Sequence, residues 1–224
     1  MPRKNVPPEI KSGKIGPYRF LQGGAGQKLT ADSVLLADFI PPLKETDSII
    51  ELGCGAGALL LLLAWKSRAS KITGIEIEGK AASIAADNIA LNGLDDRVGV
   101  LKSDYREIEG VFPKGSFNAV VSNPPYMKKG ACRISPTKER ALARSEVEGE
   151  ISDLIAVSKY LVADGGKVYF VFPVARLFEM LGCLRAAGLR PLRLRFARVS
   201  KAKPAKIFLL EAGMQGELTI EEEV

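Results

Sequence analysis

The chain has 224 residues, of which 46% are hydrophobic and 26% charged, with a formal net charge of +6 and no histidine. This length and balance are typical of one large globular domain and exclude a fibrous or disordered chain. The lack of histidine excludes histidine-dependent triads and most catalytic zinc or iron sites. The 3 cysteines lie far apart with no CxxC pairing, so neither a disulfide framework nor a metal site is expected.

The N-terminal segment is basic, but no apolar segment of signal-peptide type follows it. No run of about eighteen apolar residues occurs, so no membrane span is predicted and a cytoplasmic protein is expected. The positive charge is concentrated in residues 176–206, where Glu179 is the single acid. Such a run is usually a solvated surface, although it also suits a polyanionic partner.

In residues 1–46 the sequence predicts one helix, which starts at Thr30 or Asp32. From residue 47 onward, apolar runs alternate with glycine-rich breaks and helical stretches. The pattern predicts a strand and turn over 47–57, strands over 71–78, 97–104, 116–123 and 167–173, and helices over 58–68, 79–93, 151–166 and 174–188. Two further runs, 189–200 and 205–213, predict a β-hairpin with a basic connection.

This alternation predicts an α/β fold with helices on both faces of the sheet. We expect a Rossmann-like, doubly wound sheet of seven strands, mostly parallel, with an antiparallel C-terminal hairpin. Residues 127–149 form a long polar connection without a strand pattern, and loops of that length are usually functional or mobile.

A glycine-rich turn, Glu51 to Gly57, lies between the first predicted strand and its helix. Glycines here let the backbone approach a ligand closely, and the helix N-terminus presents N–H groups to an anion. The next strand ends at Glu76, where doubly wound nucleotide-binding folds place an acid on ribose hydroxyls. Asp104 ends the third strand and is placed to accept a hydrogen bond from an adenine amine. A tight turn without a ligand, solvated acids and a dinucleotide site remain alternatives at this point.

Asn123-Pro124-Pro125-Tyr126 follows the apolar run 117–121. Proline lacks an N–H group, so this tetrapeptide is predicted where a buried strand ends. Since an open parallel sheet binds ligands at the carboxyl ends of its strands, Asn123 is expected beside the glycine turn, Glu76 and Asp104.

Together these motifs resemble the class I S-adenosylmethionine-dependent methyltransferases, and the fourth-strand motif resembles that of amino-group N-methyltransferases. The resemblance implies S-adenosylmethionine as cofactor, a methyltransferase domain over 47–224, and a lead-in over 1–46 that packs on the cofactor side. The glycine turn would hold the methionine part, Glu76 the ribose and Asp104 the adenine amine. The cofactor-binding residues expected on this basis are Lys28, Asp32, Glu51, Gly53, Gly55, Gly57, Glu76, Asp104 and Asn123.

An adenine or amide nitrogen is a poor nucleophile because its lone pair is delocalised, so it must be positioned in line with the methyl group. The side-chain oxygen of Asn123 and the carbonyl of Pro124 are expected to accept its two N–H groups. Tyr126 is expected to stack on the base. These three residues are the predicted catalytic residues.

The flanks of the motifs, 18–39 and 123–144, resemble the bacterial family that methylates adenine N6 beside the anticodon of valine tRNA. The resemblance implies a tRNA partner and an RNA-binding surface. The expected substrate-binding residues are Lys128, Lys129, Arg140, Arg144, Arg193, Arg195, Lys201 and Lys203. This chain has Thr30-Ala31-Asp32 where the family has Gly-Thr-Asp, which leaves the tRNA species open.

The same tetrapeptide also serves protein glutamine N5-methyltransferases and enzymes that act on rRNA or DNA bases. A release-factor enzyme would carry a sizeable helical domain ahead of the glycine turn, and 46 residues leave little room for it. A non-catalytic RNA-binding factor is a further alternative, because a fold alone does not fix function.

Overall fold

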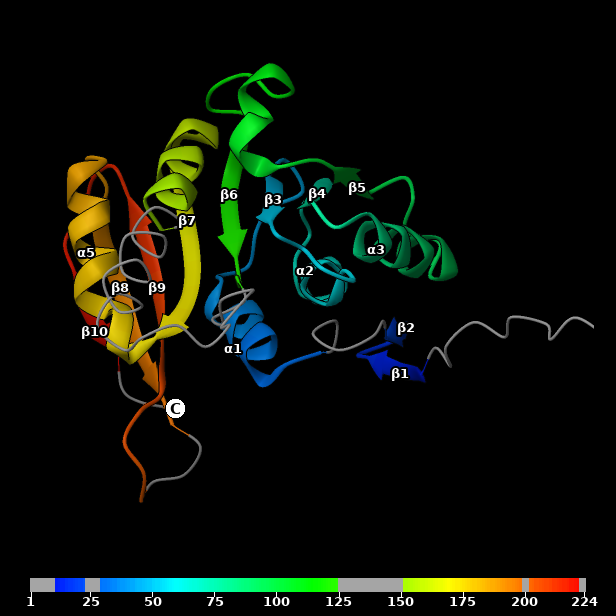
Figure 1. Cartoon of the computed structure of the whole chain (residues 1–224), viewed down its shortest axis with the longest axis horizontal. Helices are drawn as coiled ribbons and strands as arrows, with labels where there is room; N and C mark the ends of the chain where they lie inside the picture. The colour runs from blue at the N-terminus through cyan, green and yellow to red at the C-terminus, as the bar shows by residue number, and fades with distance from the viewer. Residues whose placement is uncertain (1–10, 23–28, 125–150, 199–201, 222–224) are drawn as a thin grey trace, which may run out of the picture.

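A central sheet of eight strands organises the computed structural model, which describes residues 11–22, 29–124, 151–198 and 202–221 (Figure 1). Its strands are β3 (Ser48–Leu52), β4 (Lys71–Glu76), β5 (Val98–Lys102), β6 (Phe117–Ser122), β7 (Val162–Pro173), β8 (Arg190–Ala197), β9 (Ile207–Gly213) and β10 (Thr219–Glu221). A separate hairpin joins β1 (Lys11–Ile15) to β2 (Tyr18–Gln22). The α-helices are α1 (Ala31–Phe39), α2 (Ala58–Lys66), α3 (Gly79–Leu91), α5 (Leu177–Ala186) and a helix over 151–161, and the short 3-10 helices are η1 (Tyr105–Gly110) and η2 (Val174–Arg176).

The strand order is β10-β8-β9-β7-β6-β3-β4-β5. The strands from β7 to β5 run parallel to one another, whereas β9 is antiparallel to both β7 and β8. The chain winds from β3 outward to β5 and then returns to β6 on the other side of β3, so the order reverses between β3 and β6. Such a switch point opens the crevice in which doubly wound sheets bind ligands. The predicted α/β fold and its antiparallel C-terminal hairpin are confirmed.

The side chains of the inner strands alternate between two apolar cores. Ile49 and Val121 belong to a core shared with α1, α2 and α3, whereas Ile50 and Val120 belong to one shared with α5 and the helix over 151–161. Because both faces are covered, the parallel strands read as continuous apolar runs in the sequence. The predicted helices on both faces of the sheet are therefore confirmed.

Helix α2 is apolar from Ala58 to Trp65, and all of its residues from Ala58 to Ala64 are buried. A helix of this kind needs cover on its outer face. The N-terminal segment supplies it, since α1 and β1 both contact α2. At the β1–β2 turn, Gly16 has a φ of 56°, and a Cβ there would lie 2.4 Å from the Trp65 ring, so only glycine fits. The division of the chain at residue 46 stays a prediction.

The sheet has eight strands and not the predicted seven, and the hairpin β1–β2 was not predicted either. Strand β10 is three residues long and lies in an acidic segment without apolar alternation. Its position depends on side chains of β8 that are distant in the sequence, as described below. No helix in the described part of the chain has the length and apolarity needed to cross a membrane.

Candidate functional site

The glycine turn after β3 holds an open, left-handed backbone. Gly53, Gly55 and Gly57 have φ angles of 78°, 55° and 82°. A Cβ built on Gly53 or Gly55 would meet nothing within 4 Å, whereas one on Gly57 would lie 3.2 Å from Ala85 of α3. The first two glycines therefore line space that a ligand can enter, and the third allows α2 and α3 to pack closely.

Glu76 closes this turn from the end of β4. One carboxylate oxygen accepts a hydrogen bond from the backbone N–H of Gly55 at 2.8 Å, and the other accepts one from the N–H of Glu78 at 2.8 Å. Each oxygen of a carboxylate has two lone pairs, so Glu76 retains capacity for further donors. The strand-end acid thus lies against the glycine turn, as the sequence predicted.

Glu51 lies beneath the turn on β3 and is 2% exposed. Its Oε2 has no hydrogen-bond partner among the described residues. Burial, and after it the charge of Glu76, raises the pKa of Glu51 well above its usual value. Buried acceptors without a partner are rare in native proteins, and this one lies where a ligand with a donor or a positive charge would satisfy it.

Asp104 follows β5 and caps η1 by accepting a hydrogen bond from the N–H of Arg106 at 3.0 Å. The Arg106 guanidinium also forms an ion pair with the same carboxylate. The hydrogen bond from Arg106 lowers the pKa of Asp104, so this group is a carboxylate at neutral pH. Any ligand amine at Asp104 would share the carboxylate with Arg106, whose side chain is 58% exposed.

Asn123 and Pro124 follow β6, on the other side of the switch point from the glycine turn. The Ser122 hydroxyl donates to the Leu52 carbonyl at 2.7 Å, which ties the end of β6 to the end of β3. The Asn123 side chain is half-buried, and its Nδ2 donates to Ser33 Oγ of α1 at 2.9 Å. In Figure 1 the β6 arrow points toward α1. The glycine turn and the Asn-Pro segment therefore share one edge of the sheet.

Asp32 lies in the first turn of α1, directly before Ser33. Seven of the predicted site residues lie outside the described residues: Lys28, Tyr126, Lys128, Lys129, Arg140, Arg144 and Lys201. The sequence did not single out Ser33 or Arg106. Arg106 had a readable pattern, two residues after a strand-end acid, whereas nothing local marks a serine in the first turn of a helix.

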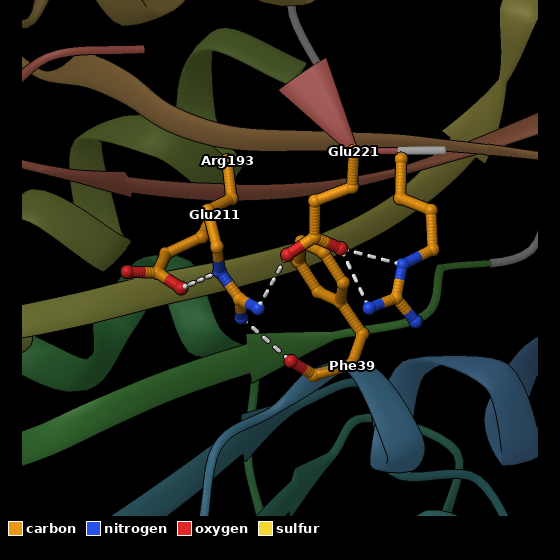
Figure 2. A network of polar contacts seen from close by, with 5 residues as sticks. Phe39, Arg193, Glu211 and Glu221 are labelled. Carbon is orange, nitrogen blue, oxygen red and sulfur yellow. Dashed lines mark hydrogen bonds and ion pairs between the residues drawn. The ribbon is translucent and has the colours of Figure 1, made fainter. Parts of the chain in front are cut away.

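Arg193 and Arg195, predicted to bind substrate, lie in an internal ion-pair network (Figure 2). Arg193 pairs with Glu211 at 2.7 Å and with Glu221 of β10 at 2.9 Å, and Arg195 pairs with Glu221 at 2.6 Å. Arg193 Nη2 also donates to the Phe39 carbonyl at 2.6 Å. Both guanidinium groups lie over the Phe39 ring, 4.2 and 5.1 Å from its centroid. Their donors are thus directed into the chain, whereas Lys203, in the connection from β8 to β9, is exposed.

Residues 25–173 match the family model of the methyltransferase small domain. The chain belongs to this family of class I S-adenosylmethionine-dependent methyltransferases. The match includes the glycine turn, Glu76, Asp104 and Asn123.

Curated relatives agree with this family. A tRNA1(Val) (adenine(37)-N6)-methyltransferase of Aeromonas hydrophila is 32% identical over 160 residues, which are 71% of this chain and 64% of the relative. The enzyme of that name from Vibrio campbellii is 27% identical over 207 residues, or 92% of this chain and 84% of the relative.

Solved structures resemble the fold. A predicted O-methyltransferase from Agrobacterium tumefaciens has a TM-score of 0.67 at 21% identity, with 86% of each chain covered. A geranyl diphosphate methyltransferase in complex with S-adenosylmethionine has a TM-score of 0.61 at 14% identity, covering 83% of this chain and 85% of the other. These similarities establish the architecture of a methyltransferase and leave the acceptor to be argued from the site.

Proposed function

We propose that this protein transfers a methyl group from S-adenosylmethionine to the exocyclic N6 amine of an adenine in tRNA, next to the anticodon. The observation that carries the proposal is the position of Asn123 and Pro124, at the end of β6 and across the switch point from the glycine turn. The names of the tRNA1(Val) (adenine(37)-N6)-methyltransferases, which align with up to 94% of the chain, support the choice of acceptor.

The residues at the turn fit this cofactor. The open space at Gly53 and Gly55 suits the methionine part, whose ammonium group would satisfy the unpartnered oxygen of Glu51. Glu76 would hold the ribose hydroxyls and Asp104 the adenine amine, and Lys28 and Asp32 would lie on the same side. When bound, the cofactor supplies an electrophilic methyl group on a sulfonium.

The chain itself must position the acceptor nitrogen. In our proposal the Asn123 side-chain oxygen and the Pro124 carbonyl each accept one N–H of the adenine amine. These two hydrogen bonds favour a tetrahedral nitrogen, which directs its lone pair away from the ring. Tyr126 would stack on the extruded base, a contact available to any aromatic face.

The tRNA backbone would lie along the carboxyl edge of the sheet. Both ends of the connection from β8 to β9 lie there, because Ala197 at the end of β8 pairs with Ile207, and Ile207 pairs with Pro173 at the end of β7. Lys203 is exposed in this connection. We assign the phosphate contacts to Lys203 together with Lys128, Lys129, Arg140, Arg144 and Lys201, and give Arg193 and Arg195 a structural role because their donors are used inside the chain.

The test is transfer of labelled methyl from S-adenosylmethionine to unmodified tRNA, followed by nucleoside analysis. N6-methyladenosine in tRNA is the expected product. Parallel reactions with rRNA, DNA and a protein extract supply the other acceptors. Label in one of these and not in tRNA would overturn the proposed substrate, and N5-methylglutamine in the protein fraction would identify the acceptor as a side-chain amide.

A further inference from the structure

The first turn of α1 contacts the proposed acceptor site directly. Ser33 is 6% exposed and lies 90 residues before Asn123 in the sequence, yet its Oγ accepts a hydrogen bond from Asn123 Nδ2 at 2.9 Å. A buried hydroxyl that reaches a side-chain amide on another element restricts how that amide is oriented.

The orientation matters because the two ends of an amide are opposite in kind: the oxygen accepts hydrogen bonds and the NH2 group donates them. With Nδ2 donating to Ser33, Oδ1 is the end of the Asn123 amide that does not take part in this hydrogen bond. A reversed amide would point its NH2 group at an acceptor amine that also carries N–H groups, and two donors repel each other. We propose that Ser33 is a positioning residue that holds the Asn123 amide with its oxygen toward the methyl acceptor.

The Ser33 hydroxyl is itself held. Thr30 caps α1 by accepting a hydrogen bond from the Ser33 N–H at 3.2 Å, and its Oγ1 lies 3.1 Å from Ser33 Oγ. A Ser33 O–H that donates to Thr30 leaves its lone pairs for Asn123. At the other end of α1, Arg193 is bonded to the Phe39 carbonyl. The cap thus orients the Ser33 hydroxyl within the first turn, and the C-terminal end of α1 is tied to β8.

This inference rests on the proposed role of Asn123, and a double-mutant cycle tests it. Ser33→Ala should lower kcat about tenfold, as expected for loss of one neutral hydrogen bond, and leave KM for tRNA and Kd for the cofactor unchanged. In an Asn123→Ala background, Ser33→Ala should not lower kcat any further. Ser158→Ala is the matched control, because this fully buried hydroxyl donates to Leu154 of its own helix, far from α1. Equal losses from Ser33→Ala in both backgrounds would overturn the proposal.

A second measurement does not need activity. The side-chain NH2 signals of Asn123, assigned in 15N spectra by their loss in Asn123→Ala, should exchange slowly with water in the wild-type chain. They should exchange at least several times faster in Ser33→Ala and remain slow in Ser158→Ala. Unchanged exchange in Ser33→Ala would refute the positioning role. If the wild-type protein methylates another acceptor, the proposed substrate fails while these spectra still decide the role of Ser33, and the cycle is run with that acceptor.

Discussion

Glu51 is an ionisable group within the sheet, and its Oε2 has no partner among the described residues. Water stabilises a carboxylate far better than a protein interior does, so the residue favours its neutral form when no cation is near. The same oxygen provides a place for the positive end of the cofactor. A group that destabilises the free protein at neutral pH is thus explained by the ligand that the family binds.

We expect Glu51→Gln to change how stability depends on pH. Because the pKa of Glu51 is raised in the folded protein, its contribution to stability is full below the ordinary value of 4.5 and is lost as the pH rises toward the folded pKa. Thermal melts from pH 5 to 8 should show a smaller loss of stability with rising pH for Glu51→Gln, which should be more stable than wild type at pH 8.

Cofactor binding should weaken in Glu51→Gln, measured by calorimetry, because the neutral amide no longer attracts an ammonium group. The control is Glu217→Gln, since Glu217 is exposed and forms no ion pair among the described residues. If the melting temperatures of wild type and Glu51→Gln changed equally with pH across this range, the raised pKa of Glu51 would be contradicted.

Asn123→Ala should lower the rate of methyl transfer by about 10²-fold or more, because one preorganised acceptor for the target N–H group is lost. Cofactor affinity should barely change. Asn118→Ala, at the opposite end of β6, removes an amide that accepts from the Ser48 N–H and should leave the rate unchanged. Loss of cofactor binding in Asn123→Ala but not in Asp104→Ala would reverse the assigned roles.

At the scale of elements, β10 joins the C-terminal segment to α1 through the side chains of β8. Glu221 pairs with Arg193 and Arg195 of β8, and Arg193 in turn bonds to the end of α1. The network supports a helix that carries Ser33, so a three-residue strand at one end of the sheet is linked to the proposed active site.

Glu221→Gln should destabilise the protein by about 1–2 kcal/mol, between the values for exposed and buried pairs, because its side chain is 23% exposed. Burial alone would raise the pKa of Glu221, but hydrogen bonds from Arg195 and Arg193 lower it. The stabilisation is therefore present above the ordinary pKa of 4.5 and is lost as the pH falls through the lowered value. Urea melts should show a difference in the free energy of unfolding between wild type and Glu221→Gln that is larger at pH 7 than at pH 3. Glu217→Gln should unfold with the same free energy as wild type at both pH values. An equal difference at pH 7 and pH 3 for Glu221→Gln would exclude the ion pairs as the cause of its destabilisation.

At the scale of the whole molecule, the net charge of +6 matters through its distribution. Arg193 and Arg195 of β8 are neutralised by nearby acids, while Lys203 stays exposed beside the carboxyl edge of the sheet. The surface available to a polyanion is thus smaller than the run of basic residues in the sequence indicates.

Lys203→Ala should weaken tRNA binding and reduce the slope of log K against log salt by about one, since one phosphate contact is lost. Lys71→Ala, an exposed lysine at the amino end of β4, should change neither quantity. Filter binding between 50 and 200 mM salt, a range chosen because phosphate contacts weaken strongly across it, measures both variants. Equal effects of the two substitutions, or an affinity independent of salt, would argue against a tRNA backbone at this edge.

The sequence by itself determined the order of strands and helices, the glycine turn and the Asn-Pro segment, because each depends on short-range pattern. The spacing of apolar residues and the positions of glycine and proline determine the conformation of the backbone nearby. The strands from β3 to β9, and the shared edge of Gly53, Glu76 and Asn123, were therefore predictable. The antiparallel pairing of β8 and β9 followed from two adjacent apolar runs in the same way.

Only the tertiary structure decided which side chains are already partnered. Arg193 and Arg195 look like free cations in the sequence, but acids 18 to 28 residues away pair with them, and both lie over an aromatic ring on α1. Ser33 gains its role from an amide 90 residues distant, and one oxygen of Glu51 is left without a partner among the described residues. Hydrogen bonds, ion pairs and desolvation depend on distances in space of a few ångströms, and such distances between remote residues exist only once the chain has folded.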